Sequence, residues 1–282
     1  MFLDRLSLKN LRNIKEVNLT LHNKTNVIIG ENAAGKTTLL EAVDILSRGR
    51  SFRTNKTESL VRHGASSFYV GGTTGPDKKK LEIEKSKNRT KISVGGKEEK
   101  KQSKLAQELA IQSIHPNSHS LIEGPPSERR AFLDWGLFHV EHEFRKEWSS
   151  YVKILRQRNE ALKSGRDDEK TWMEKLAVSG QAVSLLRERY VLGLEKSIIE
   201  TQKYLMPESE VTFYYEKGWE KEKSFMEVLI EKSGLDADRG YTSCGPQNAD
   251  VRIMLNNKEA QKICSRGQQK LIANIMLLSQ AK

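Results

Sequence analysis

The first thirty residues alternate between short apolar runs and polar turns. The runs FLDRLSL, KEVNLTL and TNVIIG are separated by KNLRN and HNK, and this spacing predicts three short strands joined by turns. The third run is continuous and rich in β-branched residues, which is typical of a strand buried on both faces of a sheet. From residue 36 the apolar period becomes helical and Gly49 ends it, so we expect a helix there.

Three further apolar runs follow that predicted helix. FYVGGTT, KLEIEKS and TKISVGG lie between residues 68 and 96, and their composition and spacing predict antiparallel strands. A strand, a loop and a helix beside such a meander favour an α/β core with an antiparallel flank.

The pattern becomes helical again from residue 127. Apolar residues recur at spacings of three, four and seven on both sides of the polar segment KSGRDDEK, which predicts an antiparallel helical hairpin that turns at Gly165. The second helix has over thirty residues before Pro207, so it would span roughly 50 Å, and we expect it to project as an arm. EVTFYYEKGW and DVRIMLNNKEA then predict strands, the latter with an Asn-Asn turn.

The composition is that of a chain with one or two domains and a modest core. Of its 282 residues, 37% are hydrophobic and 30% are charged. No run approaches the ~18 apolar residues of a membrane helix, and the charged start of the chain resembles no signal peptide. The two cysteines, Cys244 and Cys264, are twenty residues apart and form no CxxC. We therefore expect reduced thiols in a cytoplasmic protein without a membrane partner.

The net charge of +11 points to a polyanionic partner, with nucleic acid first. The excess is concentrated in residues 78–104, which hold eleven Lys or Arg against four Asp or Glu. Two interpretations of this segment stay open at this point. It is either a solvated, lysine-rich hairpin or a surface that follows a phosphate backbone.

Residues 30–37, GENAAGKT, match the pattern G-x-x-x-x-G-K-[ST] at every fixed position. Gly30 and Gly35 allow unusual backbone dihedrals and a close approach to phosphates, and Lys36 supplies a charge for the β- and γ-phosphates. The Thr37 hydroxyl is placed to ligate Mg²⁺. The predicted nucleotide-binding residues of this loop are Gly30, Glu31, Asn32, Ala33, Ala34, Gly35, Lys36, Thr37 and Thr38.

A second possible anion site lies in the last eighteen residues, SRGQQKLIANIMLLSQAK. Ser265 is a good helix N-cap and Gly267 permits close approach, so the free N–H groups of this helix start would face an anion. By spacing alone, an ordinary capped helix explains the segment equally well.

Several segments together carry a family resemblance over nearly the whole chain. They are LKNLRNI, GENAAGKTTLLEAV, RGRSFRT, SERRAFLDWGLFHVE, RQRNEAL, GYTSCGP and SRGQQKL. On these segments the chain resembles the RecF family of bacterial DNA replication and repair proteins, whose ATPase heads are similar to those of ABC and SMC proteins. Transporter ATPases usually read LSGGQ at the last motif, so Arg266 argues against that class.

The resemblance implies a P-loop NTPase of the ABC-ATPase type, α/β in class, with an antiparallel β flank and an inserted helical arm. We expect three parts. Residues 1–110 form an ATPase lobe with the phosphate loop, residues 111–207 form the helical arm, and residues 208–282 form a second lobe segment that ends in the signature helix.

The resemblance also gives a role to the last helix. In such ATPases the signature serine and helix N-terminus of one subunit cap the γ-phosphate held by another subunit. Carried over to this chain, Ser265, Arg266, Gly267 and Gln268 act in trans on ATP bound at Lys36 of a second copy. An ATP-dependent homodimer with two-fold symmetry follows from this arrangement.

The implied function is that of an ATP-dependent DNA-binding protein of replication, recombinational repair and the SOS response. It would bind single-stranded DNA and junctions at gaps and help to load the recombinase with mediator proteins. The alternatives are the nucleotide-binding subunit of an ABC transporter and a catalytically dead fragment that binds ATP and DNA.

Three further residues are assigned by the resemblance. Arg12 and Asn13 follow the first strand, where related heads contact the ribose or base, although a plain turn is the other interpretation. Gln112 in LAIQSIHP matches the position of a Q-loop glutamine that would orient water or Mg²⁺. A polar residue on a surface loop is the alternative there.

Two neighbouring arginines, Arg129 and Arg130, allow two interpretations. They would either lie near DNA or pin the arm to the head by pairing with acids such as Asp134. We favour pinning.

Hydrolysis requires an apolar strand that ends in paired acids, and in the family this strand follows the signature helix. VTFYYE ends in Glu216 but precedes the signature, which is the wrong order. We therefore expect a chain truncated before this motif. The family implies a slow ATPase, and whether this chain hydrolyses ATP stays open.

Overall fold

The computed structural model describes residues 2–54, 56–165 and 169–282. Contacts divide the chain into two compact units, Met1–Ser113 and Ile114–Lys282, called unit 1 and unit 2 below. The division into an ATPase lobe, an arm and a second lobe segment stays a prediction. Residues 166–168 of the expected polar turn lie outside the described residues.

Unit 1 is built on an antiparallel sheet of six strands in the order β2-β1-β3-β4-β5-β6. The strands are β1 (Phe2–Leu11), β2 (Ile14–Thr20), β3 (Ser67–Gly75), β4 (Lys79–Ser86), β5 (Thr90–Val94) and β6 (Lys97–Glu99). The strands predicted from the first two apolar runs and from residues 68–96 are confirmed. The basic segment 78–104 forms the β4–β6 meander and the start of the helix that follows it.

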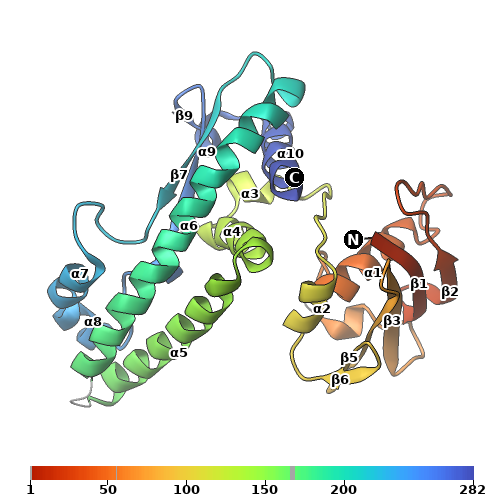
Figure 1. The fold of residues 1–282 in the computed structure, drawn as a ribbon, viewed down its shortest axis with the longest axis horizontal. Helices are drawn as coiled ribbons and strands as arrows, with labels where there is room; N and C mark the ends of the chain where they lie inside the picture. The colour runs from red at the N-terminus through yellow and green to blue at the C-terminus, as the bar shows by residue number, and fades with distance from the viewer. Residues whose placement is uncertain (1, 55, 166–168) are drawn as a thin grey trace. The chain divides into compact units, whose positions relative to one another are not determined.

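Helix α1 (Lys36–Arg48) lies across one face of this sheet (Figure 1) and contacts β1, β3 and β4. It ends where predicted, because Gly49 adopts the left-handed conformation of a C-cap, with φ of 69°. Ile45 and Leu46 are fully buried against sheet residues such as Leu8 and Val70. The short elements η1 (Thr57–Ser59) and α2 (Ser103–Glu108) complete the unit.

The strand predicted from TNVIIG is wrong. Residues 25–30 form no strand, and the side chains of Val27 and Ile29 are 77% and 88% exposed. A segment forms a strand only where a neighbouring strand pairs with its backbone N–H and C=O groups. The six strands of unit 1 pair with one another and not with this segment, so its β-branched composition alone does not make it a strand.

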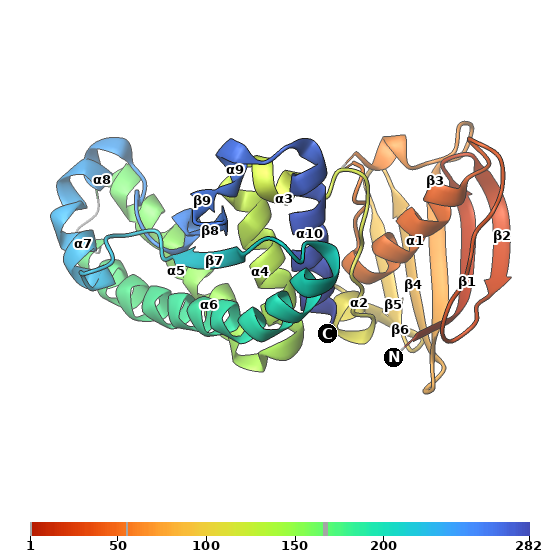
Figure 2. The ribbon, with the colours of Figure 1, turned by 90° about the horizontal axis from the view of Figure 1, so that it is seen from above.

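Unit 2 is mainly helical. Its elements are α3 (Ser120–Glu123), α4 (Pro126–Val140), α5 (His142–Ser164), α6 (Glu169–Leu205), β7 (Val211–Glu216), α7 (Phe225–Glu231), α8 (Ser233–Arg239), η2 (Pro246–Asn248), β8 (Asp250–Leu255), β9 (Lys258–Glu259), α9 (Ala260–Ile263) and α10 (Arg266–Ala281). The predicted hairpin is confirmed as α5 and α6, and Gly165 caps the end of α5 with φ of 62°. Helix α6 runs through the unit in contact with α4, α5, α7, α10 and β7 (Figures 1 and 2).

A small antiparallel sheet of order β7-β8-β9 packs beside these helices. Asn256 and Asn257 join β8 to β9 with φ of 49° and 62°, which is the positive-φ pair of a tight hairpin turn. The predicted Asn-Asn turn and both predicted strands are therefore confirmed.

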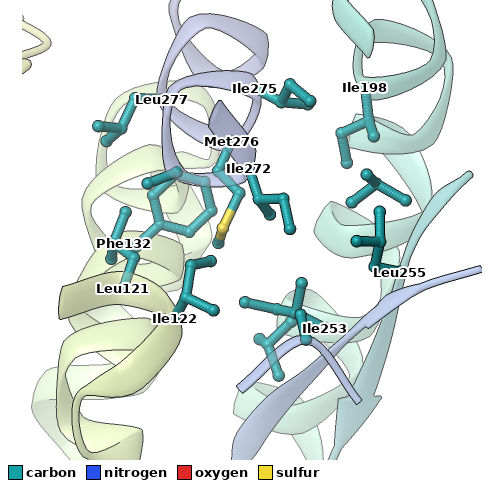
Figure 3. Close-up of a cluster of buried hydrophobic side chains, with 14 of the residues drawn as sticks. Leu121, Ile122, Phe132, Ile198, Ile253, Leu255, Ile272, Ile275, Met276 and Leu277 are labelled. Carbon is teal, nitrogen blue, oxygen red and sulfur yellow. The ribbon is translucent and has the colours of Figure 1, made fainter. Parts of the chain in front are cut away.

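The larger core of unit 2 joins this sheet to α3, α4, α6 and α10 (Figure 3). Ile272 and Ile275 of α10 are fully buried there, near Ile198 of α6 and Ile253 of β8. Burying such a side chain is worth about 1.5–3 kcal/mol. The apolar side chains that recur along the last helix are thus buried inside unit 2, while the N-terminus of the helix reaches the surface.

Two bidentate ion pairs tie α4 to the rest of unit 2. Arg129 donates to both carboxylate oxygens of Asp250 at 2.7 and 2.9 Å, and Arg187 makes the same contact with Asp134, at 2.9 Å for both bonds. Arg129 therefore pairs with an acid, as the pinning interpretation expected, although that acid is Asp250 and not the Asp134 named as an example. Arg130 donates to the Ala249 carbonyl at 2.7 Å, and while burial raises the pKa of Asp134, the charge of Arg130 acts to lower it. Asp134 is taken by Arg187 because α6 brings that fully buried guanidinium beside it.

A third buried arginine holds the other end of the helical hairpin. Arg158 of α5 is fully buried and donates to Asp236 at 2.8 Å, to Thr242 at 2.7 Å and to Glu169 at 2.7 Å. A buried charge requires such complete pairing, because removing one partner costs several kcal/mol. The RQRNEAL and GYTSCGP segments thus meet in the fold. No helix in the described ranges combines the length and hydropathy that a bilayer crossing requires.

Candidate nucleotide-binding site

The predicted phosphate loop forms a left-handed turn in front of α1. Ala33 and Gly35 have φ of 65° and 95°, and a non-glycine residue rarely adopts the first value. The Ala33 carbonyl accepts a hydrogen bond from the Asn13 amide at 2.9 Å, which holds this conformation. Local backbone strain of this kind is typical of sites that are shaped for a ligand.

Lys36 is the first residue of α1, and its side chain folds back over the loop. Its ammonium group donates to the carbonyl oxygens of Gly30 and Glu31, both at 2.6 Å. An ammonium has three protons, so one remains for a ligand. The charge therefore lies directly at the mouth of the loop.

Arg12 is fixed by a fully buried carboxylate on α1. Its guanidinium donates to both oxygens of Glu41, at 2.8 and 3.1 Å, and to the Ser59 carbonyl at 2.8 Å. Ser51 also donates to Glu41, and Arg53 lies 3.9 Å from the same carboxylate. Since three of the five guanidinium N–H groups are used, Arg12 is held in place and still has two to offer.

Asn13 bridges the loop and the helix. Besides its bond to Ala33, its side-chain oxygen accepts from the buried Thr38 hydroxyl at 3.4 Å. A Cβ at Gly35 would lie 3.3 Å from Ile14 and 3.5 Å from Asn13, so the turn between β1 and β2 packs closely on the loop. The prediction that Arg12 and Asn13 accompany the loop agrees with this placement, although a nucleotide contact stays a prediction.

These residues surround a hollow of about 610 Å³ inside unit 1. Ligand pockets for small molecules are commonly of this size. Its lining consists of Arg12, Asn13, Asn32, Ala33, Gly35, Lys36, Thr37, Thr38, Arg53, Ser59 and Val61. Glu41, Ser51, Arg53 and Ser59 were not predicted to belong to this site. One signal was available, because Glu41 shares the buried side of α1 with Ala42 and Ile45.

Gln112 does not line this hollow. It lies at the end of unit 1, and the neighbouring Ser113 donates to Asp44 of α1 at 3.1 Å. Burial raises the pKa of Asp44, although its ion pair with Arg48 acts in the opposite sense. The segment that carries Gln112 is thus anchored to the same helix as the phosphate loop, and its Q-loop role stays a prediction.

The second predicted anion site lies at the start of α10 in unit 2. Ser265 and Gln268 form a capping box, in which the Ser265 hydroxyl accepts from the Gln268 N–H at 3.3 Å and Gln268 accepts from the Ser265 N–H at 2.9 Å. Both side chains are exposed, as are Arg266 and Gly267. A Cβ at Gly267 would meet only the Ser265 hydroxyl, at 3.9 Å. The signature residues therefore form an open, preorganised helix start.

Comparison with known proteins places this arrangement in a family. Residues 1–241 match the AAA ATPase domain family. The protein from Glaesserella parasuis called DNA replication and repair protein RecF is 36% identical over 287 residues, which cover 100% of this chain and 80% of that protein. A relative of the same name from Vibrio vulnificus is 35% identical with the same coverage. The chain belongs to the RecF family.

Solved structures agree with this membership. The recombination mediator protein RecF, solved with ATP, superposes with a TM-score of 0.91 at 28% identity, and the match covers 99% of this chain and 80% of that one. The Smc head domain from Pyrococcus furiosus shares 14% identity with a TM-score of 0.57. This RecF-family chain therefore has the ATPase-head fold that RecF shares with SMC proteins, as predicted.

Proposed function

We propose that this chain binds ATP with Mg²⁺ at the phosphate loop and acts in DNA replication and recombinational repair. The observation that carries the proposal is the strained loop capped by Lys36, in a chain whose relative was solved with ATP. The relatives are named for DNA replication and repair. Family membership also favours this function over the transporter alternative.

The loop residues suit a magnesium-bound triphosphate. The N–H groups at the start of α1 and the Lys36 ammonium would hold the phosphates, and the exposed Thr37 hydroxyl would ligate the metal. Among residues 2–54, 56–165 and 169–282, no group of three or more His, Cys, Asp or Glu is placed to hold an ion. Mg²⁺ bound with a triphosphate is held by one or two protein oxygens, phosphates and water. Bound there, the ion would neutralise phosphate charge.

Arg12, fixed by Glu41, is proposed to direct its remaining N–H groups toward the nucleotide. Asn13 keeps the loop in its left-handed conformation and would thereby act as a positioning residue. Gln112 is proposed to reach the Mg²⁺ or its water.

Two copies are proposed to close over the bound triphosphate. The Ser265 hydroxyl accepts a bond from its own helix, so its proton remains free to donate. Together with the exposed N–H groups of Arg266 and Gly267, it would cap the γ-phosphate held at Lys36 of a second copy. ADP lacks this phosphate, so the dimer would depend on the nucleotide state.

DNA is the proposed macromolecular partner. The excess positive charge supports it, and the β4–β6 region displays exposed lysines such as Lys87, Lys91 and Lys97. Gaps and single-strand junctions are the proposed substrates, and loading of the recombinase with mediator proteins is the proposed outcome. A solved relative is described as a recombination mediator in the RecFOR pathway.

Mixing two inactive variants tests the composite site. Lys36→Ala removes the phosphate contact, and Ser265→Asp keeps the helix cap while placing a negative charge where the γ-phosphate is expected. Neither variant alone should form additional dimer when Mg²⁺-ATP is added, as measured by sedimentation velocity. Their equimolar mixture should form heterodimers, because the Lys36 of one copy and the Ser265 of the other make one intact site.

Two results would count against the proposal. A mixture that stays as monomeric as its components contradicts sharing of the site between copies, and normal dimerisation of Ser265→Asp alone contradicts the role of the signature. Binding of the same samples to gapped DNA should follow the dimer fraction and weaken steeply with salt.

A further inference from the structure

Helix α6 exposes a straight row of apolar side chains that its unit does not use. Val178, Leu185, Leu192 and Ile199 are spaced by seven residues and are 76%, 41%, 65% and 46% exposed. We call these four side chains the α6 stripe. The opposite face of the helix is packed into unit 2 (Figure 2). The stripe thus runs along the middle of the solvent-facing side.

Such a row differs from ordinary surface exposure. Single exposed apolar residues are common and require no explanation. The stripe, however, keeps one position of a heptad over three repeats, and 21 residues of helix span roughly 31 Å. A seven-residue repeat keeps its positions along one line of a helix in a left-handed supercoil. The stripe carries one apolar position in each heptad, whereas a full coiled-coil seam carries two.

Charged rows of opposite sign flank the stripe. Three residues after a stripe position come Glu188 and Glu195, and four residues after it come Arg189 and Lys196. On a helical surface these positions lie on opposite sides of the stripe. All four are exposed, and no ion pair between the described residues engages them.

These rows make the helix complementary to its own copy in one orientation. When two identical helices pair in parallel about a two-fold axis, the acidic row of each faces the basic row of the other. In an antiparallel pair, like rows would meet and repel. The charge pattern therefore favours a second copy of α6 as the partner helix, and it favours the parallel orientation over the antiparallel one.

We propose that the α6 stripe is a docking surface for the α6 helix of a second copy of this chain, in parallel and with two-fold symmetry. Only one position per heptad is apolar, so the contact is weak and belongs to the transient class of interfaces. The proposal uses unit 2 alone and does not rest on the nucleotide site.

A charge-swap series tests the pairing without nucleotide. It uses the Lys36→Ala variant of this chain without ATP, so that failure of the proposed ATP dimer cannot affect the result. Glu188→Lys with Glu195→Lys should weaken self-association about tenfold in sedimentation equilibrium, because repulsion replaces attraction on both sides. Adding Arg189→Glu and Lys196→Glu should restore the starting affinity, because the rows are then exchanged and again complementary.

Failure of the series is unambiguous. A double variant that associates as strongly as its parent, or a fourfold variant that stays as weak as the double, overturns the proposal. A parent that is monomeric at all concentrations overturns it as well, even if the helix binds another protein.

Disulfide trapping tests the direction. In a Cys264→Ser background, where the remaining Cys244 is fully buried, Leu192→Cys should form a disulfide between copies, since parallel pairing places identical positions together. Gly193→Cys is the matched control, because it is exposed on the same turn but lies beside the stripe. Cross-linking of Leu192→Cys only with a Leu185→Cys copy would show antiparallel pairing and overturn the proposal.

Discussion

The two helix starts that the sequence marks as anion sites are built in different ways. Helix α1 follows Gly35 at φ 95°, and no side chain in the described residues caps its first turn. Helix α10 follows Ser265, whose side chain and that of Gln268 satisfy two of the free N–H groups. The first turn of α1 therefore leaves its N–H groups to a ligand, whereas the start of α10 is already capped by its own side chains.

This difference separates two kinds of preorganisation. At α1 the loop stores strain in Ala33 and holds it with Asn13 and Lys36, so a ligand would complete the structure. At α10 the geometry exists before any ligand arrives, because the capping box fixes it locally. Substitutions at the start of α1 should therefore change both ligand binding and the free energy of unfolding. Conservative substitutions at the start of α10 should change only one of these two quantities.

The largest effect is expected at Lys36. Lys36→Ala should weaken ATP binding about tenfold to hundredfold, because a charge-assisted contact to phosphate is worth about 1.5–3 kcal/mol. Titration with a fluorescent nucleotide measures this. The control is Lys270→Ala in the first turns of α10, which should leave the affinity of a single copy unchanged. Equal losses in both variants would contradict the assignment of the phosphate site to α1.

Glycines at the two helix starts should respond with opposite signs. Gly35→Ala should lower the free energy of unfolding by about 1–3 kcal/mol, since its φ of 95° is strained for alanine and its Cβ would press on Ile14. Gly267→Ala should raise it by about 0.5–1 kcal/mol, because that site is open and helical. Urea unfolding followed by circular dichroism compares them. Destabilisation of the same size in both variants would mean that α10 is as constrained as α1.

The smallest effect should come from the cap of α10. Ser265→Ala should lower the free energy of unfolding by about 1 kcal/mol, while Ser265→Asp should stay within about 0.5 kcal/mol of the parent, because aspartate is an equally good N-cap. Thermal unfolding without nucleotide measures both. If the two variants lose the same stability, the capping box does not hold this helix start.

Local patterns predicted much of the fold correctly. The strands β1 to β5, β7 and β8, the α5–α6 hairpin and the ends of α1 follow from apolar spacing and glycine positions. These features depend on neighbours along the chain, and the residues that cause them are therefore visible in sequence.

The failures share one cause. TNVIIG has the composition of a buried strand but lacks paired neighbours here. Asp134 was named as an example of a partner for Arg129 or Arg130, and its carboxylate accepts from Arg187, 53 residues away. Glu41 accepts hydrogen bonds from Arg12 and Ser51 and lies 3.9 Å from Arg53, so its partners come from two separate segments. Each outcome is set by contacts between distant parts of the chain.

The sequence by itself determined the phosphate loop, the capped final helix and the family, because glycines, a lysine and a serine at fixed spacing shape the backbone locally. Only the tertiary structure decided how Arg12 is held, which acid each buried arginine meets, and which face of α6 stays open. A side chain's partner is the residue that packing brings within reach of it, and packing is a property of the folded unit.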